Sequence, residues 1–143
     1  MSYTAMDIAK YIINKCVADD WAVSNLQLQK ILYFSFGEYL TKKNQCLFQE
    51  PFLAWKYGPV VENVYNNYRC YGASKIYDAY EIRLPDDVKE IIDPVIEQRR
   101  KQSIGGLLND AHTPKGAWDK VYDGRKESVI PLEDIKEEFG VRE

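Results

Sequence analysis

Apolar residues near the start of the chain recur with the spacing of an α-helix. The residues at i, i+3, i+4 and i+8 that fall on one face are Ile8, Tyr11, Ile12 and Cys16. Thr4 precedes this pattern, and Asp7 follows it by three residues, which is the spacing of a capping box. The pattern therefore predicts a first helix that starts at Thr4 and fades around residues 18–20.

A second helix is predicted from Ser24, with Gln27 at the matching capping-box position and the polar run 41–44 at its end. One stripe of this helix holds Leu28, Ile31, Leu32, Ser35 and Tyr39. Further apolar residues at positions 34, 36 and 40 cover its other faces. A helix that is apolar nearly all round is packed on several sides, so we expect it at the centre of the fold.

The helical pattern stops between residues 47 and 57, where Pro51 interrupts it and alternation predicts a short strand or an extended arm. Gly58 and Pro59 then interrupt the regular pattern. Because proline suits the first turn of a helix, we expect Pro59 to open a third helix that ends before Gly72. Residues 80–84 alternate like another short strand.

The second half of the chain again predicts helices. Pro85 marks a helix start, and the helical phase continues across Pro94, which predicts one kinked helix. Shorter helices are expected from Ser103 to about residue 112, around residues 117–121, and after Pro131, with residues 128–130 extended. Residues 1–143 contain no internal repeat or linker, so the sequence predicts a single, compact, mainly α domain.

Composition narrows the functional classes. The formal charge of −3 argues against a broad nucleic-acid surface, and the apolar runs are too short to span a membrane. The N-terminus lacks the pattern of a secretory signal, and the three cysteines are scattered, which favours the reducing cytoplasm. The 11 tyrosines suit either a core or a protein interface.

Residues that carry chemistry do not assemble into a site. His112 is the one histidine, without a second histidine or a cysteine at ligand spacing, so we expect a structural role for it and no metal or other cofactor. No glycine-rich phosphate loop and no nucleophile–base pair are present, so we expect no enzymatic activity. The basic triplet 99–101 fits a helix C-terminus better than a nucleic-acid contact.

The block from Trp55 to Val61 is a compact group of aromatic residues on a turn that contains glycine and proline. It can be an elbow that packs in the core, or a rigid aromatic anchor for a partner. We expect Trp55 to be structural. The predicted partner-binding residues are Lys56, Tyr57, Gly58 and Pro59, with Tyr57 as the best candidate for contact.

Four ordered blocks resemble one known family. They are the helix Leu26–Leu40 with Lys30, the segment Leu47–Tyr68 with Ala54, Trp55, Gly58, Pro59 and Val60, the segment Leu107–Trp118 with His112 and Trp118, and the terminal stretch Val129–Phe139. Together they cover nearly the whole chain. This arrangement resembles the Panacea-domain antitoxins, which include the SocA-like and prophage GepA-like proteins. The resemblance marks Lys30, Trp55, His112 and Trp118 as positions of the family's structural motifs.

The resemblance implies a mainly helical domain, with room for a small β-hairpin, and a bacterial or prophage protein without enzymatic activity. Its partner would be a protein toxin encoded by an adjacent gene and neutralised by direct binding. Two alternatives stay open: an adaptor or chaperone-like protein that presents a partner to a protease, and a small DNA-binding regulator that uses residues 99–101. Whether the protein is a monomer or a homo-oligomer is also open at this stage.

Overall fold

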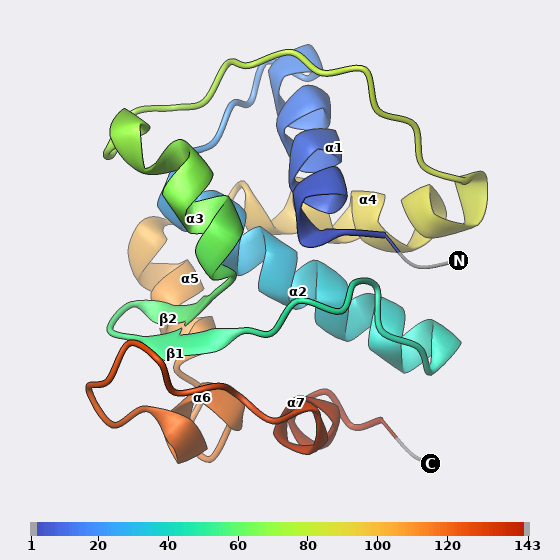
Figure 1. The fold of residues 1–143 in the computed structure, drawn as a ribbon. Coiled ribbons are helices and arrows are strands. Elements are labelled where there is room, and N and C mark those ends of the chain that lie inside the picture. Colours follow the sequence, from blue (N-terminus) through green and yellow to red (C-terminus); the bar gives the residue numbers. More distant parts are fainter. Residues whose placement is uncertain (1–2, 142–143) are drawn as a thin grey trace.

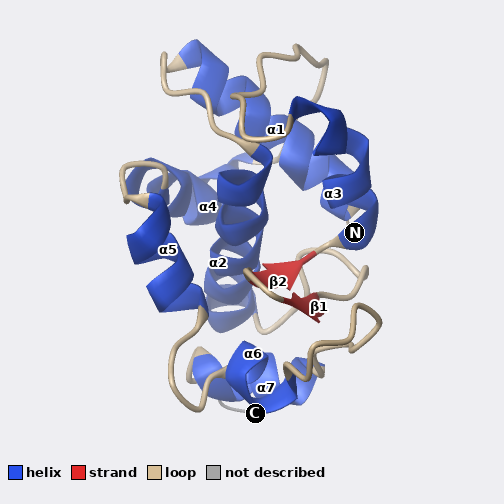
Figure 2. Ribbon diagram, turned by 90° about the vertical axis from the view of Figure 1, so that its left-hand side faces the viewer, coloured by secondary structure: helices blue, strands red, loops and turns tan. Residues whose placement is uncertain are grey.

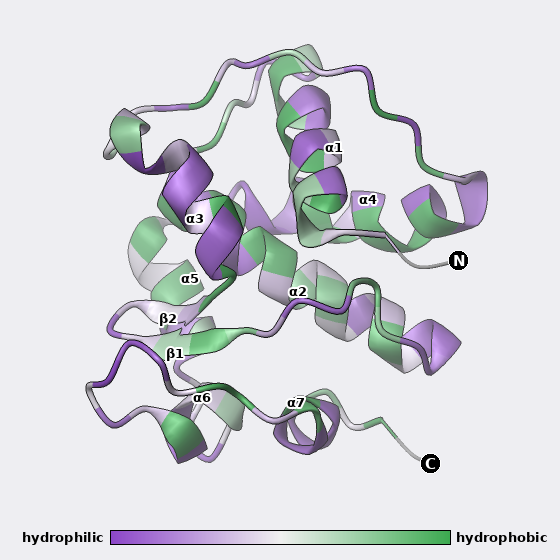
Figure 3. Ribbon diagram, viewed as in Figure 1, coloured by the Kyte–Doolittle hydropathy of each residue, from purple (hydrophilic) through white to green (hydrophobic). Residues whose placement is uncertain are grey.

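The helix Asn25–Lys43 (α2) runs through the middle of the molecule, as the sequence predicts. In the computed structural model, which describes residues 3–141, nearly all of its side chains between residues 28 and 37 are buried. Ser24 and Gln27 form the predicted capping box at its start. Asn44 ends it in the left-handed conformation with φ 52°, after two lysines in the last turn. Figure 3 shows hydrophobic residues along much of its length.

The other elements surround this helix. In chain order the elements around α2 are α1 (Ala5–Ala18), β1 (Leu53–Trp55), β2 (Gly58–Val60), α3 (Glu62–Tyr68), the 3₁₀ turn η1 (Arg69–Tyr71), α4 (Asp86–Arg99), α5 (Ile104–Ala111), α6 (Ala117–Val121) and α7 (Leu132–Glu138). The helices α1 and α3 lie on one side of α2, and α6 and α7 lie on the other (Figure 1, Figure 2). The fold is mainly α, as predicted.

The helix starts predicted near both ends of the chain are confirmed. Thr4 and Asp7 form the capping box of α1, Ser103 caps α5, and Pro131 directly precedes α7. The helix α4 continues through Pro94 as one element, which confirms the single helix predicted across this proline. No observation tests the predicted kink.

The prediction of a helix start at Pro59 is wrong. β1 and β2 form an antiparallel hairpin with Ala54 opposite Pro59, and α3 begins only at Glu62. The Ala54 N–H points away from β2 and donates to the Ser128 carbonyl at 2.9 Å. The Ala54–Pro59 pair is therefore one that exchanges no ladder hydrogen bonds, so the missing N–H of proline costs this strand nothing.

The strand predicted at residues 80–84 is also wrong, because this segment pairs with no strand among residues 3–141. Asn14 of α1 takes that place: its Nδ2 donates to the Tyr80 carbonyl at 2.7 Å, and the Tyr80 N–H donates to its Oδ1 at 2.9 Å. One side chain thus satisfies both backbone groups of Tyr80, and the segment stays irregular. Figure 1 shows it arching over α1.

The C-terminal part of the chain closes over α2. Glu138 accepts hydrogen bonds from the Tyr33 hydroxyl at 2.8 Å and from the Ala117 N–H at 2.9 Å, which joins α7 to α2 and α6. The Phe139 ring lies against Gly37, where an added Cβ would come within 2.3 Å of the ring. Residues 128–130 run beside β1 in the predicted extended form, and Ile130 N–H donates to the Phe52 carbonyl at 2.8 Å.

Candidate functional site

The hairpin that contains the aromatic block has an exposed tip on a buried base. Lys56 and Tyr57 form its two-residue turn and are exposed, whereas Gly58, Pro59 and Val60 are buried. The Tyr57 side chain is 53% exposed, and the Lys56 ammonium lies 5.4 Å from the centroid of its ring. Of the four residues predicted to contact a partner, two therefore present their side chains to solvent and two hold the turn.

A buried lysine on α2 supports the base of the hairpin. Lys30, on α2, is fully buried, and its Nζ donates to the Pro59 carbonyl at 2.9 Å. Burial lowers the pKa of this amine to about 7. Gly58 has φ +111°, and a Cβ at this position would lie 3.0 Å from the Lys30 Nζ and 3.3 Å from the Ala111 Cβ. The turn therefore requires glycine for its dihedral angle and for the space that the lysine occupies.

His112 and Trp118 lie next to this base and stack on each other, with ring centroids 3.8 Å apart. The Trp118 indole N–H donates to the Trp55 carbonyl at 2.6 Å, which fastens the stack to the hairpin. His112 Nε2 is buried without a hydrogen-bond partner among the described residues. Burial and the positive charge of Lys30 both lower the pKa of His112. The structure thus brings Lys30, Trp55, His112 and Trp118 together around one turn.

A chain of amide hydrogen bonds holds the other flank of the hairpin. Gln29 accepts from the Val61 N–H at 3.0 Å and donates to the Asn25 side chain at 3.1 Å. Asn25 in turn donates to the Tyr65 carbonyl at 3.1 Å, and the Tyr65 ring meets the Trp55 ring edge-on at 5.0 Å. These contacts fix the angle between α2, the hairpin and α3.

Between these supports lies a groove of about 760 Å³. Its walls come from the first turns of α2, the hairpin tip, α3 with the residues that follow it, and the loop 122–126. Trp55 and Tyr57 line it, and the Trp55 indole N–H donates to the Lys126 carbonyl at 2.7 Å across its edge. The predicted partner-binding tip thus stands at the rim of a groove.

The comparison with known families connects this geometry to a class of proteins. The model of the family described as "Antitoxin SocA-like, Panacea domain" matches residues 28–119, a range that contains Lys30, the whole hairpin, His112 and Trp118. The chain belongs to this family. The resemblance predicted from the sequence motifs is therefore confirmed.

A curated relative supports the same assignment. This SocA-like chain is 32% identical to "Antitoxin SocA" of Caulobacter vibrioides (strain NA1000 / CB15N), in an alignment that covers 86% of the chain and 72% of that protein. No solved structure matches it. Both comparisons agree on an antitoxin role for this SocA-like protein.

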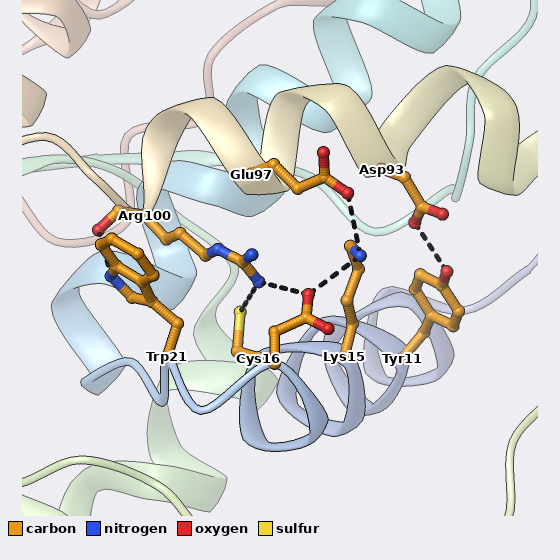
Figure 4. Close-up of polar contacts among 8 residues, drawn as sticks. Tyr11, Lys15, Cys16, Trp21, Asp93, Glu97 and Arg100 are labelled. Carbon is orange, nitrogen blue, oxygen red and sulfur yellow. Dashed lines mark hydrogen bonds and ion pairs between the residues drawn. The ribbon is translucent and has the colours of Figure 1, made fainter.

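The basic triplet of this SocA-like chain is largely used within the fold. Arg100 is buried, and its guanidinium contacts Asp19 at 2.8 Å and the Cys16 sulfur at 4.0 Å, where α4 ends beside α1 (Figure 4). Arg99 pairs with Asp110 at 2.6 Å. The Lys101 ammonium lies 5.9 Å from the centroid of the Trp21 ring. All three cations thus have contacts within the fold, which weakens the alternative of a DNA-binding regulator built on residues 99–101.

Neither a metal site nor a membrane-spanning helix is found in the described part of the chain. Among residues 3–141, no group of three or more histidine, cysteine or acidic residues is arranged to hold a metal ion. Within the same range, every helix is too short or too polar to cross a membrane.

Sequence reasoning missed most of the groove. Arg69, Tyr122, Arg125 and Lys126 line it but come from two segments far apart in the chain, and none of them belongs to a recognised motif. Asn25 and Gln29 could have been found from the sequence, because they are four residues apart at the start of a helix predicted to be packed on several sides, and buried amides need partners.

Proposed function

We propose that this SocA-like protein neutralises a protein toxin by binding it directly, with the hairpin tip and the adjacent groove as the contact surface. The family supports the antitoxin role. The observation that carries the surface assignment is the exposure of Tyr57 on a buried base whose Pro59 carbonyl accepts a hydrogen bond from Lys30.

Such a tip is suited to binding because little of it has to be ordered when the partner arrives. Gly58 and Pro59 are fixed against Lys30, and Trp55 is held through its own indole N–H and its carbonyl. A preorganised aromatic side chain loses little conformational entropy on association, and tyrosine and tryptophan are enriched among the residues that dominate interface energies.

The test uses the purified protein and the purified toxin encoded by the adjacent gene. Tyr57→Ala should weaken binding by about 1–2 kcal/mol, which is roughly 5- to 30-fold in affinity, without lowering the melting temperature. Tyr77→Ala is the matched control, because Tyr77 is 65% exposed and lies in the segment that precedes α4. If Tyr57→Ala instead lowers the melting temperature and leaves the affinity unchanged, the tip is a structural element only.

The same purified pair separates direct neutralisation from delivery to a protease. Direct binding predicts that the antitoxin inhibits the toxin in a mixture of the two proteins alone. Inhibition that requires an added bacterial protease, with loss of the toxin band, would replace this proposal by the adaptor function.

A further inference from the structure

The groove beside the hairpin carries an unusual set of charges. Four cationic side chains line it: Lys56, Arg69, Arg125 and Lys126. Glu62 is the single acidic residue in the lining. Some cations elsewhere, such as Lys15 and Arg99, form ion pairs with carboxylates. None of the four groove cations forms an ion pair with any residue in the range 3–141. The Arg125 backbone N–H, the Ser128 hydroxyl and the Arg125 charge lower the pKa of the nearby Asp123, but Asp123 does not line the groove, whose lining therefore carries more positive than negative charge.

We infer that this groove binds a short acidic segment of the protein partner, whose carboxylates pair with the four cations. The inference rests on the proposed function and specifies the chemistry of the toxin surface that the antitoxin recognises. Arginine and lysine recognise carboxylates through charge-assisted hydrogen bonds, and the paired forks of arginine add geometric specificity. The first turn of α2 also lines the groove, so the positive end of that helix dipole adds to the attraction.

The groove also has the size and the floor for a few residues of peptide. Its volume of about 760 Å³ lies within the range of ligand-binding clefts. Trp55, Tyr57, Tyr65 and Tyr122 add aromatic surface to the lining of the groove. The hydrogen bond from Trp55 to the Lys126 carbonyl joins the loop 122–126 to the hairpin, so the walls are connected before a partner arrives. Aliphatic and aromatic side chains between the carboxylates would rest on this floor.

Charge outside the groove argues for a short protein segment over a nucleic acid. The chain has 19 basic and 22 acidic residues, so removing the groove residues leaves a stronger acidic excess on the rest. A polyanion that extends past the groove therefore meets repulsion, whereas an acidic segment of a protein can end within it. Nucleic-acid surfaces need a basic stripe that continues along the backbone.

The first experiment measures fluorescence anisotropy of a labelled hexaglutamate peptide with the intact protein. We expect saturable binding that weakens between about 50 mM and about 300 mM salt, because screening shortens the reach of the cations. Hexalysine should not bind. Arg69→Glu combined with Arg125→Glu should lower the hexaglutamate affinity at least tenfold. The control is Arg83→Glu combined with Lys101→Glu, which makes the same charge change at exposed positions outside the groove and should have a much smaller effect.

Several results would overturn the inference. A thymidine hexanucleotide that binds more tightly than hexaglutamate would assign the groove to nucleic acid. Equal losses in the two charge-reversed proteins would mean that net charge alone, and not the groove, attracts the peptide. Circular dichroism and thermal unfolding check that each variant is folded.

The two proposals fail in different ways. If Tyr57→Ala abolishes toxin binding but the Arg69/Arg125 reversal leaves it intact, the toxin is bound without the groove and only the acidic-segment inference is wrong. If the adjacent toxin does not bind at all while hexaglutamate binds and responds to the reversal, the groove specificity stands and direct neutralisation of that toxin is wrong.

Discussion

Replacing Lys30 by methionine should change how the stability of the fold depends on pH. Lys30 is fully buried, with the Pro59 carbonyl as the acceptor that its ammonium reaches. Burial lowers the pKa of the amine from 10.5 in the unfolded chain to about 7 in the folded protein. Methionine has a similar length and no charge, so Lys30→Met removes the titration while it keeps most of the packing.

The sign follows from proton binding. Between about pH 7 and pH 10.5 the unfolded chain holds a proton on Lys30 that the folded protein has released, so the stability of the wild type rises with pH in this window. This added stability is fully present above the pKa that Lys30 has in the unfolded chain, and it is lost as the pH falls to about 7. The full slope is about 1.4 kcal/mol per pH unit, which bounds the total at about 5 kcal/mol. Below about pH 7 the lysine is charged in both states and the slope vanishes.

Urea unfolding at a series of pH values from about 6 to about 9.5 measures this effect as a difference between wild type and variant. Other groups with raised pKa values, such as Cys16 and Tyr33, titrate in both proteins and cancel in the difference. His112 does not cancel, because burial and the Lys30 charge lower its pKa, and its contribution falls at the acidic end of the range. We expect Lys30→Met to be close to neutral at the acidic end, because losing the hydrogen bond to Pro59 offsets the relief of a buried charge. It should be clearly destabilised at the alkaline end. A difference that stays constant over the whole range would refute the account of Lys30 as a buried amine that is neutral above pH 7.

Three other substitutions test the packing that positions the site. Leu32→Ala should cost about 2–5 kcal/mol in a denaturant titration, because Leu32 is fully buried in α2; a loss near zero would contradict its place in the core. Gly37→Ala should destabilise the fold by about 1–3 kcal/mol, since the new methyl group would displace the Phe139 ring, and the near-ultraviolet circular dichroism should change with it. Asn14→Ala should leave two backbone groups of Tyr80 without their partners and cost about 1–3 kcal/mol. Hydrogen exchange should then accelerate around residue 80, and unchanged protection there would show that Asn14 does not hold this segment.

Local signals predicted the helices well. Both capping boxes and the apolar stripe of α2 rest on short-range spacing, which the sequence displays directly. The errors at Pro59 and at residues 80–84 share a cause, because each segment takes its conformation from a distant partner. Pro59 is a strand residue because Lys30 takes its carbonyl and Ala54 bonds elsewhere, and residue 80 is irregular because Asn14 takes both of its backbone groups.

The candidate site divides in the same way. The hairpin tip was predictable, because Trp55 to Pro59 are contiguous and chemically distinctive. The burial of Lys30 was not, since a lysine on a helix is ordinarily a surface residue and only its position under the hairpin reveals the exception. The cationic lining of the groove was hidden for another reason: its members are separated in the chain and meet only after folding.

The hairpin itself closes locally, but the contacts that make it rigid do not. The Trp55 indole bonds to a carbonyl 71 positions later, and its own carbonyl accepts from an indole 63 positions later. Contacts of such long sequence separation form slowly, because the entropy of closing the loop has to be lost before they can stabilise anything. The proposed binding surface should therefore be among the last parts of the molecule to reach its final structure. A chain that has only collapsed around α2 would carry the right residues in the wrong places, so the rate of the final folding step sets how soon a newly made molecule can engage its partner.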